Sequence, residues 1–188
     1  MTTIPHRNRR RARRPLRALG AALIAVIAML STALPASASP NPTDDGWICD
    51  GYYTIGTSNG MVFDISLGPD NAGSVLQYRY WGGYNQQWRV CHWPGDTAQY
   101  IFKSRHNGKC LTLWSLDEGS WVTEGDCNGW IYGNQIFWLS RDAATGKVAL
   151  QAEHSDMWLT TEAGKYTVER SHIVQSATRA GAFTLNPV

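Results

Sequence analysis

The sequence contains little that points to catalysis. It has no glycine-rich phosphate-binding loop. Its carboxylates are scattered and do not form the spaced pair that glycoside hydrolases use. It lacks a Cys-x-x-Cys pair, and its histidines do not cluster, which argues against a zinc site. We therefore expect a protein that is not an enzyme and that needs no cofactor and no metal.

A hydrophobic run long enough to span a membrane is also missing. The apolar run at residues 18–30 has 13 residues, whereas a spanning helix needs roughly 18 or more. Seven arginines precede this run, and Pro35 and the small residues Ala36, Ser37 and Ala38 follow it. This order is typical of a secretory signal peptide. We predict a signal peptide at residues 1–38, cleavage after Ala38 and secretion; an uncleaved anchor is the alternative.

Basic residues are scarce once this segment is set aside. The whole chain has 17 Lys and Arg against 15 Asp and Glu, a net charge of +2. Seven of the arginines lie in the predicted signal peptide, which leaves ten basic and fifteen acidic residues, a net charge of −5. The excess of basic residues thus comes from the predicted signal peptide, and it does not indicate nucleic acid as a partner.

The sequence has four cysteines, all after the predicted cleavage point: Cys49, Cys91, Cys110 and Cys127. An even number in an exported chain indicates two disulfides. Four cysteines allow three pairings, so the count alone leaves the connectivity open.

What the sequence does contain is a repeat. After a predicted flexible lead-in at residues 39–46, a turn followed by a strand recurs about every 48 residues. This pattern occurs at residues 59–65, 107–113 and 155–161. A second pattern, which ends in a large aromatic residue, follows at residues 86–88, 135–137 and 181–183. The sequence therefore predicts one domain at residues 47–188, with repeats at about 47–93, 94–142 and 143–188.

The sequence pattern of the repeats predicts β-strands. Short runs of β-branched and aromatic residues are separated by Gly, Asn, Asp and Ser, and no long stretch keeps a helical period. Nine tryptophans suit a β protein with aromatics in a shared core. Three such units cannot each bury an apolar face alone, so they must close around a common axis. We predict an all-β fold, a β-trefoil.

The first repeat resembles a known family. Its residues Asn-Gly-x-x-Phe-Asp-Ile, Val-x-x-Tyr and Asn-Gln-Gln-Trp are similar to the ricin B-type lectin repeat with its Gln-x-Trp signature. The resemblance covers residues 46–188, and it weakens from the first repeat to the third. It implies a secreted lectin that binds a galactose- or xylose-type sugar without calcium.

The resemblance also implies a role for each of five residues. Asp64 would accept hydrogen bonds from two sugar hydroxyls, and Tyr78 would lie against the C–H face of the sugar ring. Asn85 would bond a hydroxyl, Gln86 would steady the aspartate, and Trp81 would make a second ring contact. The chemistry is consistent, because a pyranose has hydroxyls at its rim and an apolar patch on its face.

The other repeats lose these residues. Thr112 and Thr160 replace the aspartate. Gly125 stands where the second repeat should have its stacking aromatic, and counting along the third repeat places Ile173 there. Asn134 and Gln135 persist in the second repeat, with Trp130 as a candidate groove residue. We therefore expect one intact sugar site, in the first repeat.

The resemblance further implies the disulfide pairing. Relatives carry an intra-repeat disulfide at the positions of Cys110 and Cys127, which leaves Cys49 to pair with Cys91. Two other functions stay open at this point: a protein-interaction trefoil, such as a protease inhibitor or a toxin-associated lobe, and a degenerate structural trefoil without a ligand.

Overall fold

The computed structural model describes residues 41–42, 46–96, 98–128 and 133–188. The predicted signal peptide at residues 1–38 and the candidate groove residue Trp130 lie outside these ranges. Within the described part of the chain, no helix is both long and apolar enough to cross a membrane.

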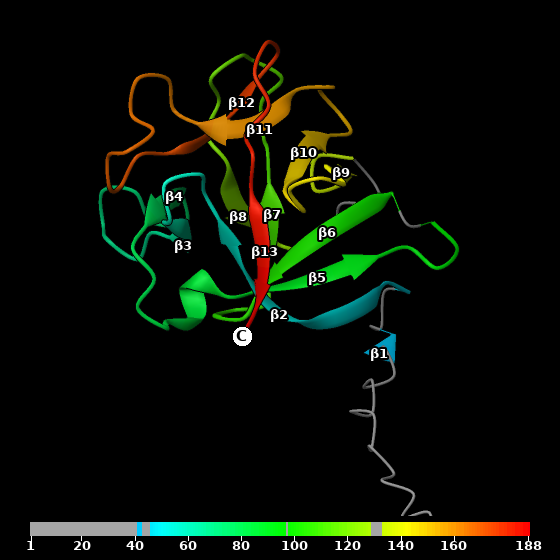
Figure 1. Cartoon of the computed structure of the whole chain (residues 1–188). Coiled ribbons are helices and arrows are strands. Elements are labelled where there is room, and N and C mark those ends of the chain that lie inside the picture. The colour runs from blue at the N-terminus through cyan, green and yellow to red at the C-terminus, as the bar shows by residue number, and fades with distance from the viewer. Residues whose placement is uncertain (1–40, 43–45, 97, 129–132) are drawn as a thin grey trace, which may run out of the picture. The chain divides into compact units, whose positions relative to one another are not determined.

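Almost all regular structure in the described residues is β-strand (Figure 1). The first repeat contains β2 (Ile48–Gly56), β3 (Val62–Ile65), β4 (Val75–Tyr78), the 3-10 helix η1 (Tyr84–Gln86) and β5 (Trp88–His92). The second contains β6 (Gln99–Ser104), β7 (Cys110–Thr112), β8 (Thr123–Gly125) and β9 (Phe137–Arg141). The third contains β10 (Val148–Ala152), β11 (Trp158–Thr161), β12 (Ile173–Ser176) and β13 (Thr184–Pro187). The all-β prediction is confirmed.

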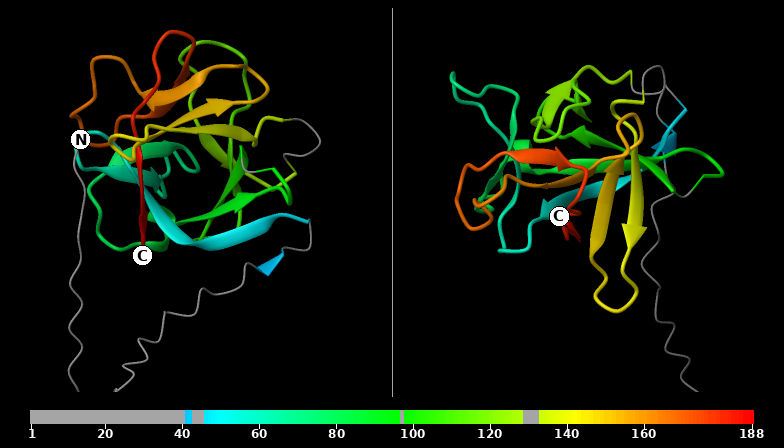
Figure 2. Two further views of the ribbon diagram at one scale, coloured as in Figure 1. Left: turned by 45° about the vertical axis from the view of Figure 1, so that its right-hand side comes forward. Right: turned by 90° about the horizontal axis from the view of Figure 1, so that it is seen from above.

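Six of these strands close into a barrel. Antiparallel pairing follows the order β2, β5, β6, β9 and β10, and β13 pairs with the other edge of β2. A bridge between Val148 and Phe183 joins β10 to the residue just before β13, and so closes the ring. Figure 2 shows β9 and β10 as a hairpin that extends away from the other strands.

The other six strands of the repeats form three hairpins, β3–β4, β7–β8 and β11–β12. Single bridges join each hairpin to the next: Ser74 to Thr123, Trp121 to Val174, and Leu76 to His172. A six-stranded barrel with three mutually bridged hairpins is a β-trefoil, so this prediction is confirmed as well.

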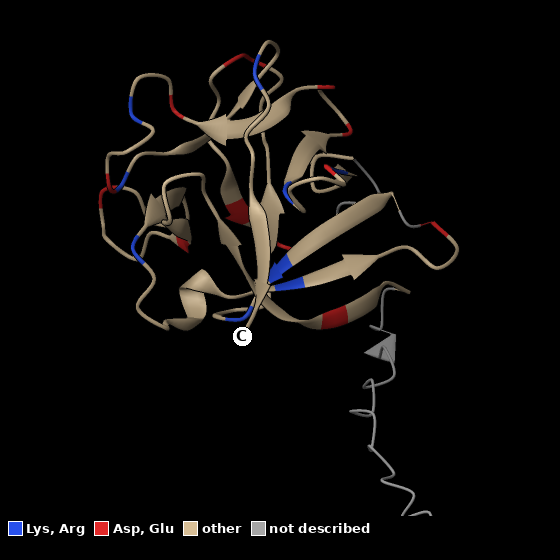
Figure 3. Ribbon diagram, in the orientation of Figure 1, with Lys and Arg blue, Asp and Glu red and all other residues tan. Residues whose placement is uncertain are grey.

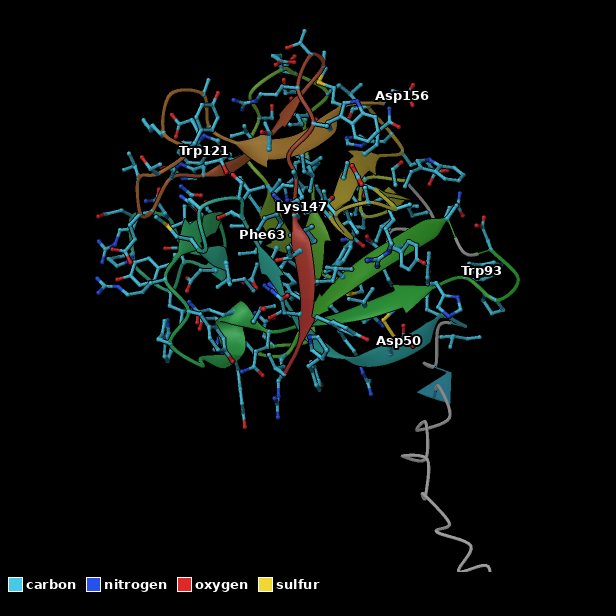
Figure 4. The ribbon with its side chains drawn as sticks, in the orientation of Figure 1. Asp50, Phe63, Trp93, Trp121, Lys147 and Asp156 are labelled. Carbon is cyan, nitrogen blue, oxygen red and sulfur yellow. A yellow bond between two sulfur atoms is a disulfide. The ribbon has the colours of Figure 1, made fainter. Side chains whose placement is uncertain are left out.

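The core explains why the second sequence pattern marks the fold. Trp88, Phe137 and Phe183, which end the three copies of that pattern, are all buried in one apolar cluster. Phe63 joins them, in edge-to-face contact with Phe183 at 5.0 Å between ring centroids, and Figure 4 places it inside the fold. Each repeat thus contributes a large aromatic residue to a core that no repeat could build alone.

Two disulfides are present, Cys49–Cys91 and Cys110–Cys127. The first joins directly paired residues of β2 and β5, and the second ties β7 to the turn after β8. Both pairings are those that the resemblance implied.

The two-residue strand β1 (Asn41–Pro42) lies within the predicted flexible lead-in and pairs with β2, a contact that the sequence did not predict. In the view of Figure 3, acidic and basic residues are scattered over loops and strands.

Strand register defines which residues of the three repeats are equivalent. Asp64 pairs with Leu76, Thr112 with Thr123, and Thr160 with Val174. Two residues beyond the second member of each pair stand Tyr78, Gly125 and Ser176, which are therefore equivalent. The expectation for the third repeat was wrong in detail: Ile173 is a buried core residue paired with Thr161, and Ser176 holds the stacking position.

Candidate functional site

A hollow of about 300 Å³ opens beside β3, β4 and η1 of the first repeat. Its lining residues are Asp64, Ser66, Leu67, Gly68, Asp70, Asn71, Leu76, Tyr78, Trp81, Asn85 and Arg170. Four of the five predicted site residues are among them, and the fifth, Gln86, is buried next to Asn85 in η1.

Asp64 lies on β3 between two core residues, Phe63 and Ile65. Because side chains alternate along a strand, its carboxylate points away from the core; even so, only 7% of the residue is exposed. Burial raises the pKa of this carboxyl above its ordinary value of 3.8, and hydrogen bonds from Gln86, Trp81 and Asn85 oppose that rise. The hollow therefore contains a sheltered acceptor.

Asn85 is held in place by two acceptors. Its side-chain amide donates to Oδ1 of Asp64 at 3.1 Å and to the carbonyl of Ile65 at 2.9 Å. Both bonds use the amide nitrogen, so the Asn85 carbonyl oxygen keeps lone pairs for a ligand.

Gln86 organises the turn that precedes η1. Its amide donates to the carbonyl of Arg79 at 2.8 Å, and its oxygen accepts the backbone N–H of Trp81 at 2.9 Å. Gln135 of the second repeat makes the same pair of bonds to its own turn. The glutamine of the repeated pattern therefore holds the turn in both repeats, and in the second its amide also donates to the hydroxyl of Thr112, the equivalent of Asp64, at 2.9 Å.

Two aromatic rings border the hollow. Tyr78 is half-buried at the end of β4, and Trp81 is 60% exposed in the turn that follows. The indole of Trp81 packs on Gly83: a β-carbon at Gly83 would collide with the far edge of the indole and would lie 2.5 Å from Oδ1 of Asn85. Gly83 has φ −66°, which any residue adopts, so this glycine is required for space and not for backbone conformation.

Arg170 is a site residue that the sequence did not predict. It comes from the third repeat, in the loop between β11 and β12, and its guanidinium carbon lies 5.8 Å from the centroid of the Tyr78 ring. Its backbone N–H donates to the carbonyl of Gln77 at 2.9 Å. The buried amide of Gln77 in turn donates to the carbonyls of Lys165 and Val168. The first repeat therefore fixes the loop that carries Arg170.

The equivalent place in the second repeat is covered. Thr112 donates its hydroxyl to the carbonyl of Cys110 at 2.8 Å. A β-carbon at Gly125 would lie 2.8 Å from the indole of Trp114, which shows that this ring occupies the space over the glycine. No carboxylate stands at the aspartate position there, and the ring over the glycine is that of Trp114, which is exposed.

The third repeat has a hollow with different chemistry. Thr160, Ser176 and Arg179 are among its lining residues. Arg179 donates to the carbonyl of Thr161 at 2.6 Å, and its guanidinium carbon lies over the Tyr166 ring, 4.3 Å from the ring centroid. The acceptor and the aromatic residue of the first repeat are thus replaced by two hydroxyls.

Comparison with known proteins agrees with this fold. The family described as ricin-type beta-trefoil lectin domain-like matches residues 43–125 and 84–176, two overlapping stretches that together cover most of the chain. The chain belongs to this family.

Solved structures of the same fold include a designed protein, a lectin and a toxin. A designed three-fold symmetric protein, ThreeFoil, is 28% identical, with a TM-score of 0.64 over 74% of this chain and 100% of the design. The Macrolepiota procera ricin B-like lectin in complex with lactose is 23% identical, with a TM-score of 0.58 over 73% of this chain and 95% of the lectin. The Haemophilus ducreyi cytolethal distending toxin is 18% identical, with a TM-score of 0.57 over 73% of this chain and 83% of the toxin chain. Among curated proteins, no relative matches at a significant level.

Proposed function

We propose that this member of the ricin-type β-trefoil lectin-like family is a carbohydrate-binding module with one sugar site, in the hollow of the first repeat. Asp64 accepts two sugar hydroxyls, Asn85 accepts a third, and Tyr78 and Trp81 provide ring contacts. Gln86 supports the turn and the carboxylate from behind.

The observation that carries the proposal is the sheltered carboxylate of Asp64 beside two accessible rings. An aspartate with so little contact with water loses solvation, so the fold keeps it only at a cost in stability. Hydrogen bonds from ligand hydroxyls to a charged acceptor contribute about 1.5–3 kcal/mol each and restore that solvation. The other two repeats, which have threonine at this position, avoid the cost.

Galactose-containing sugars are the first class to test. The Macrolepiota lectin of the same fold was solved with lactose, and lactose ends in galactose. Xylose-type sugars are the second class, because their rings also combine neighbouring hydroxyls with an apolar C–H face. A single small site of this kind implies a Kd of about 10 μM to 1 mM.

The test is a titration of lactose and of xylobiose followed by NMR chemical shifts. Asp64→Thr is the matched variant, because Thr112 and Thr160 stand at the equivalent positions and the fold accommodates them. We expect this variant to lose binding at least tenfold, since hydrogen bonds to a charged group are removed. Asp50→Asn, at an exposed acid of β2 that does not line the hollow, is the control and should retain binding.

Two results would contradict the proposal. One is the absence of shift changes at Trp81 or Asn85 with any of these sugars. The other is sugar binding that Asp64→Thr leaves intact. Recovery of a protein partner whose binding is unaffected by Asp64→Thr would instead favour a protein-interaction trefoil.

We also propose that the protein is exported. The sequence signals at residues 1–38 support this, and two disulfides are compatible with an oxidising compartment. N-terminal sequencing of the protein from culture medium tests it, with Ser39 expected as the first residue.

A further inference from the structure

Arg170 occupies a position where the second repeat has glycine. The backbone N–H of Arg170 donates to the carbonyl of Gln77, and the backbone N–H of Gly119 donates to the carbonyl of Gln175. Gln77 and Gln175 are themselves equivalent, because each follows the residue paired with Asp64 or Thr160. Arg170 and Gly119 are thus at the same place in two successive repeats.

This position has a left-handed backbone conformation. Gly119 has φ +80° and Arg170 has φ +68°. Glycine adopts such angles freely, whereas an arginine is strained by its β-carbon. In the described residues only one other non-glycine residue, Asp156, has a positive φ. A strained side chain beside a binding hollow indicates a function that offsets the strain.

The preceding residue has a different, structural role. Glu169 accepts the side chain of Arg79 at 2.7 Å, as well as the backbone N–H of Arg79 at 3.4 Å. Glu118, which precedes Gly119, likewise accepts the backbone N–H of Ala177. A glutamate bond to the adjacent hairpin is therefore common to both repeats, and the change from glycine to arginine is specific to the first-repeat site.

The charge of Arg170 is available to a ligand. Arg79 is engaged by Glu169 in a two-point ion pair. Arg170, by contrast, is exposed and takes part in none of the salt bridges between described residues. It lines the same hollow as Asp64 and Tyr78. A guanidinium offers a planar fork of donors that matches a carboxylate or a sulfate.

We propose that the first-repeat site selects a sugar that carries an anionic group, a carboxylate or a sulfate, and that Arg170 of the third repeat binds this group. The inference rests on the proposed function of the site. The Arg170 guanidinium carbon lies 5.8 Å from the centroid of the Tyr78 ring, so a sugar ring placed on Tyr78 would have part of its rim next to this group. Asn85, Gln86 and Trp81 donate to the Asp64 carboxylate, and the charge of Arg170 also lowers the pKa of this group. Asp70, at the opening of the hollow, is exposed and screened by solvent.

The experiment compares sugars that have the same ring hydroxyls but differ in whether they carry an anionic group. Methyl galactoside, galacturonic acid and galactose 6-sulfate are titrated by NMR at low and at moderate salt, with glucuronic acid against xylose as a second pair. We expect the anionic forms to bind about tenfold more tightly at low salt, and the preference to shrink as salt rises. The carboxylate and sulfate arms tell the two anionic groups apart, and a preference for either supports the proposal.

Arg170→Gly is the decisive variant. It installs the residue that the second repeat uses at this position, so the fold is retained, and it should reduce the ratio of anionic to neutral affinity to about one. Arg141→Ala, which removes an exposed arginine of β9, is matched in net charge and should leave the ratio unchanged.

Failure of this inference can be distinguished from failure of the proposed function. Equal affinity for neutral and anionic sugars in the wild type, with both lost in Asp64→Thr, would overturn the role of Arg170 and leave the sugar site standing. A preference that survives Arg170→Gly would also overturn it. No binding of any of these sugars would overturn both proposals.

Discussion

Gly83→Ala should separate sugar affinity from stability. The added methyl group would collide with the far edge of the Trp81 indole and would lie 2.5 Å from Oδ1 of Asn85. No side chain can remain at such distances, so the indole must rotate away and the Asn85 amide must shift. The backbone at Gly83, with φ −66° and ψ 148°, accepts alanine without strain.

The size of the effect follows from the contacts that move. Loss of an aromatic contact removes about 1 kcal/mol, and a misplaced hydrogen bond from Asn85 removes about 1 kcal/mol more. Together they predict a decrease in sugar affinity of about 30-fold. Stability should change by less than about 1 kcal/mol, because Trp81 is already 60% exposed and alanine restricts the unfolded chain.

Titration with sugar and urea denaturation of the same samples measure the two quantities. The neighbouring Gly82→Ala is the control. Gly82 has φ +86° and open space around its β-carbon position, so alanine there should cost about 1 kcal/mol of stability and displace no ring. If Gly83→Ala bound sugar within twofold of the wild type, the placement of Trp81 would not matter and the proposed site would be wrong in this respect.

Three further predictions concern charge, strain and crosslinking. Because burial raises the pKa of Asp64 above 3.8, this carboxylate should become protonated, and sugar affinity should fall, while the pH is lowered but still above 3.8. The folded state binds this proton more tightly than the unfolded chain does. The contribution of Asp64 to stability is therefore present at low pH and is lost as the pH rises through the raised pKa. Titrations across this range check the first effect, and a pH-independent affinity would contradict it. Arg170→Gly should leave the free energy of unfolding unchanged or raise it by up to about 1 kcal/mol, whereas Gly119→Arg should lower it by about 1 kcal/mol, and equal effects of the two changes in urea denaturation would contradict the assigned strain. Replacing Cys49 and Cys91 by serine removes a crosslink between residues 42 positions apart, and loop entropy predicts a loss of about 4 kcal/mol in thermal or urea unfolding; a loss under about 1 kcal/mol would show that the crosslink hardly restricts the unfolded chain.

Much of the fold was predictable because each repeat pattern is formed by residues that are close together in the sequence. A turn followed by an apolar strand, and a large aromatic residue after a fixed interval, recur at a spacing that the chain keeps through three repeats. Trp88 and its two counterparts are buried together, as a shared core requires. The strand at Asn41–Pro42 was missed because two residues that include a proline give no periodic signal.

The candidate site was predictable in part for the same reason. Asp64 and Tyr78 lie on paired strands of one hairpin, so a short segment of sequence brings them together. The register of the third repeat was less accessible: Ser176 precedes Gly181 by five positions, whereas Tyr78 precedes Gln86 by eight, so counting back placed Ile173 where Ser176 stands. The covering of Gly125 by Trp114 likewise depends on a side-chain direction that spacing does not specify.

The sequence by itself thus determined the repeat, the all-β class, the four cysteines and the loss of the aspartate from two of three repeats, all of which depend on residues near one another in the chain. The tertiary structure decided that Arg170 belongs to the first-repeat site. Closure of the three hairpins places the third repeat's loop on Gln77 of the first, and contacts made by closure join residues that no local pattern relates. The charge beside Asp64, and with it the class of sugar we propose, is therefore a property of the closed trefoil.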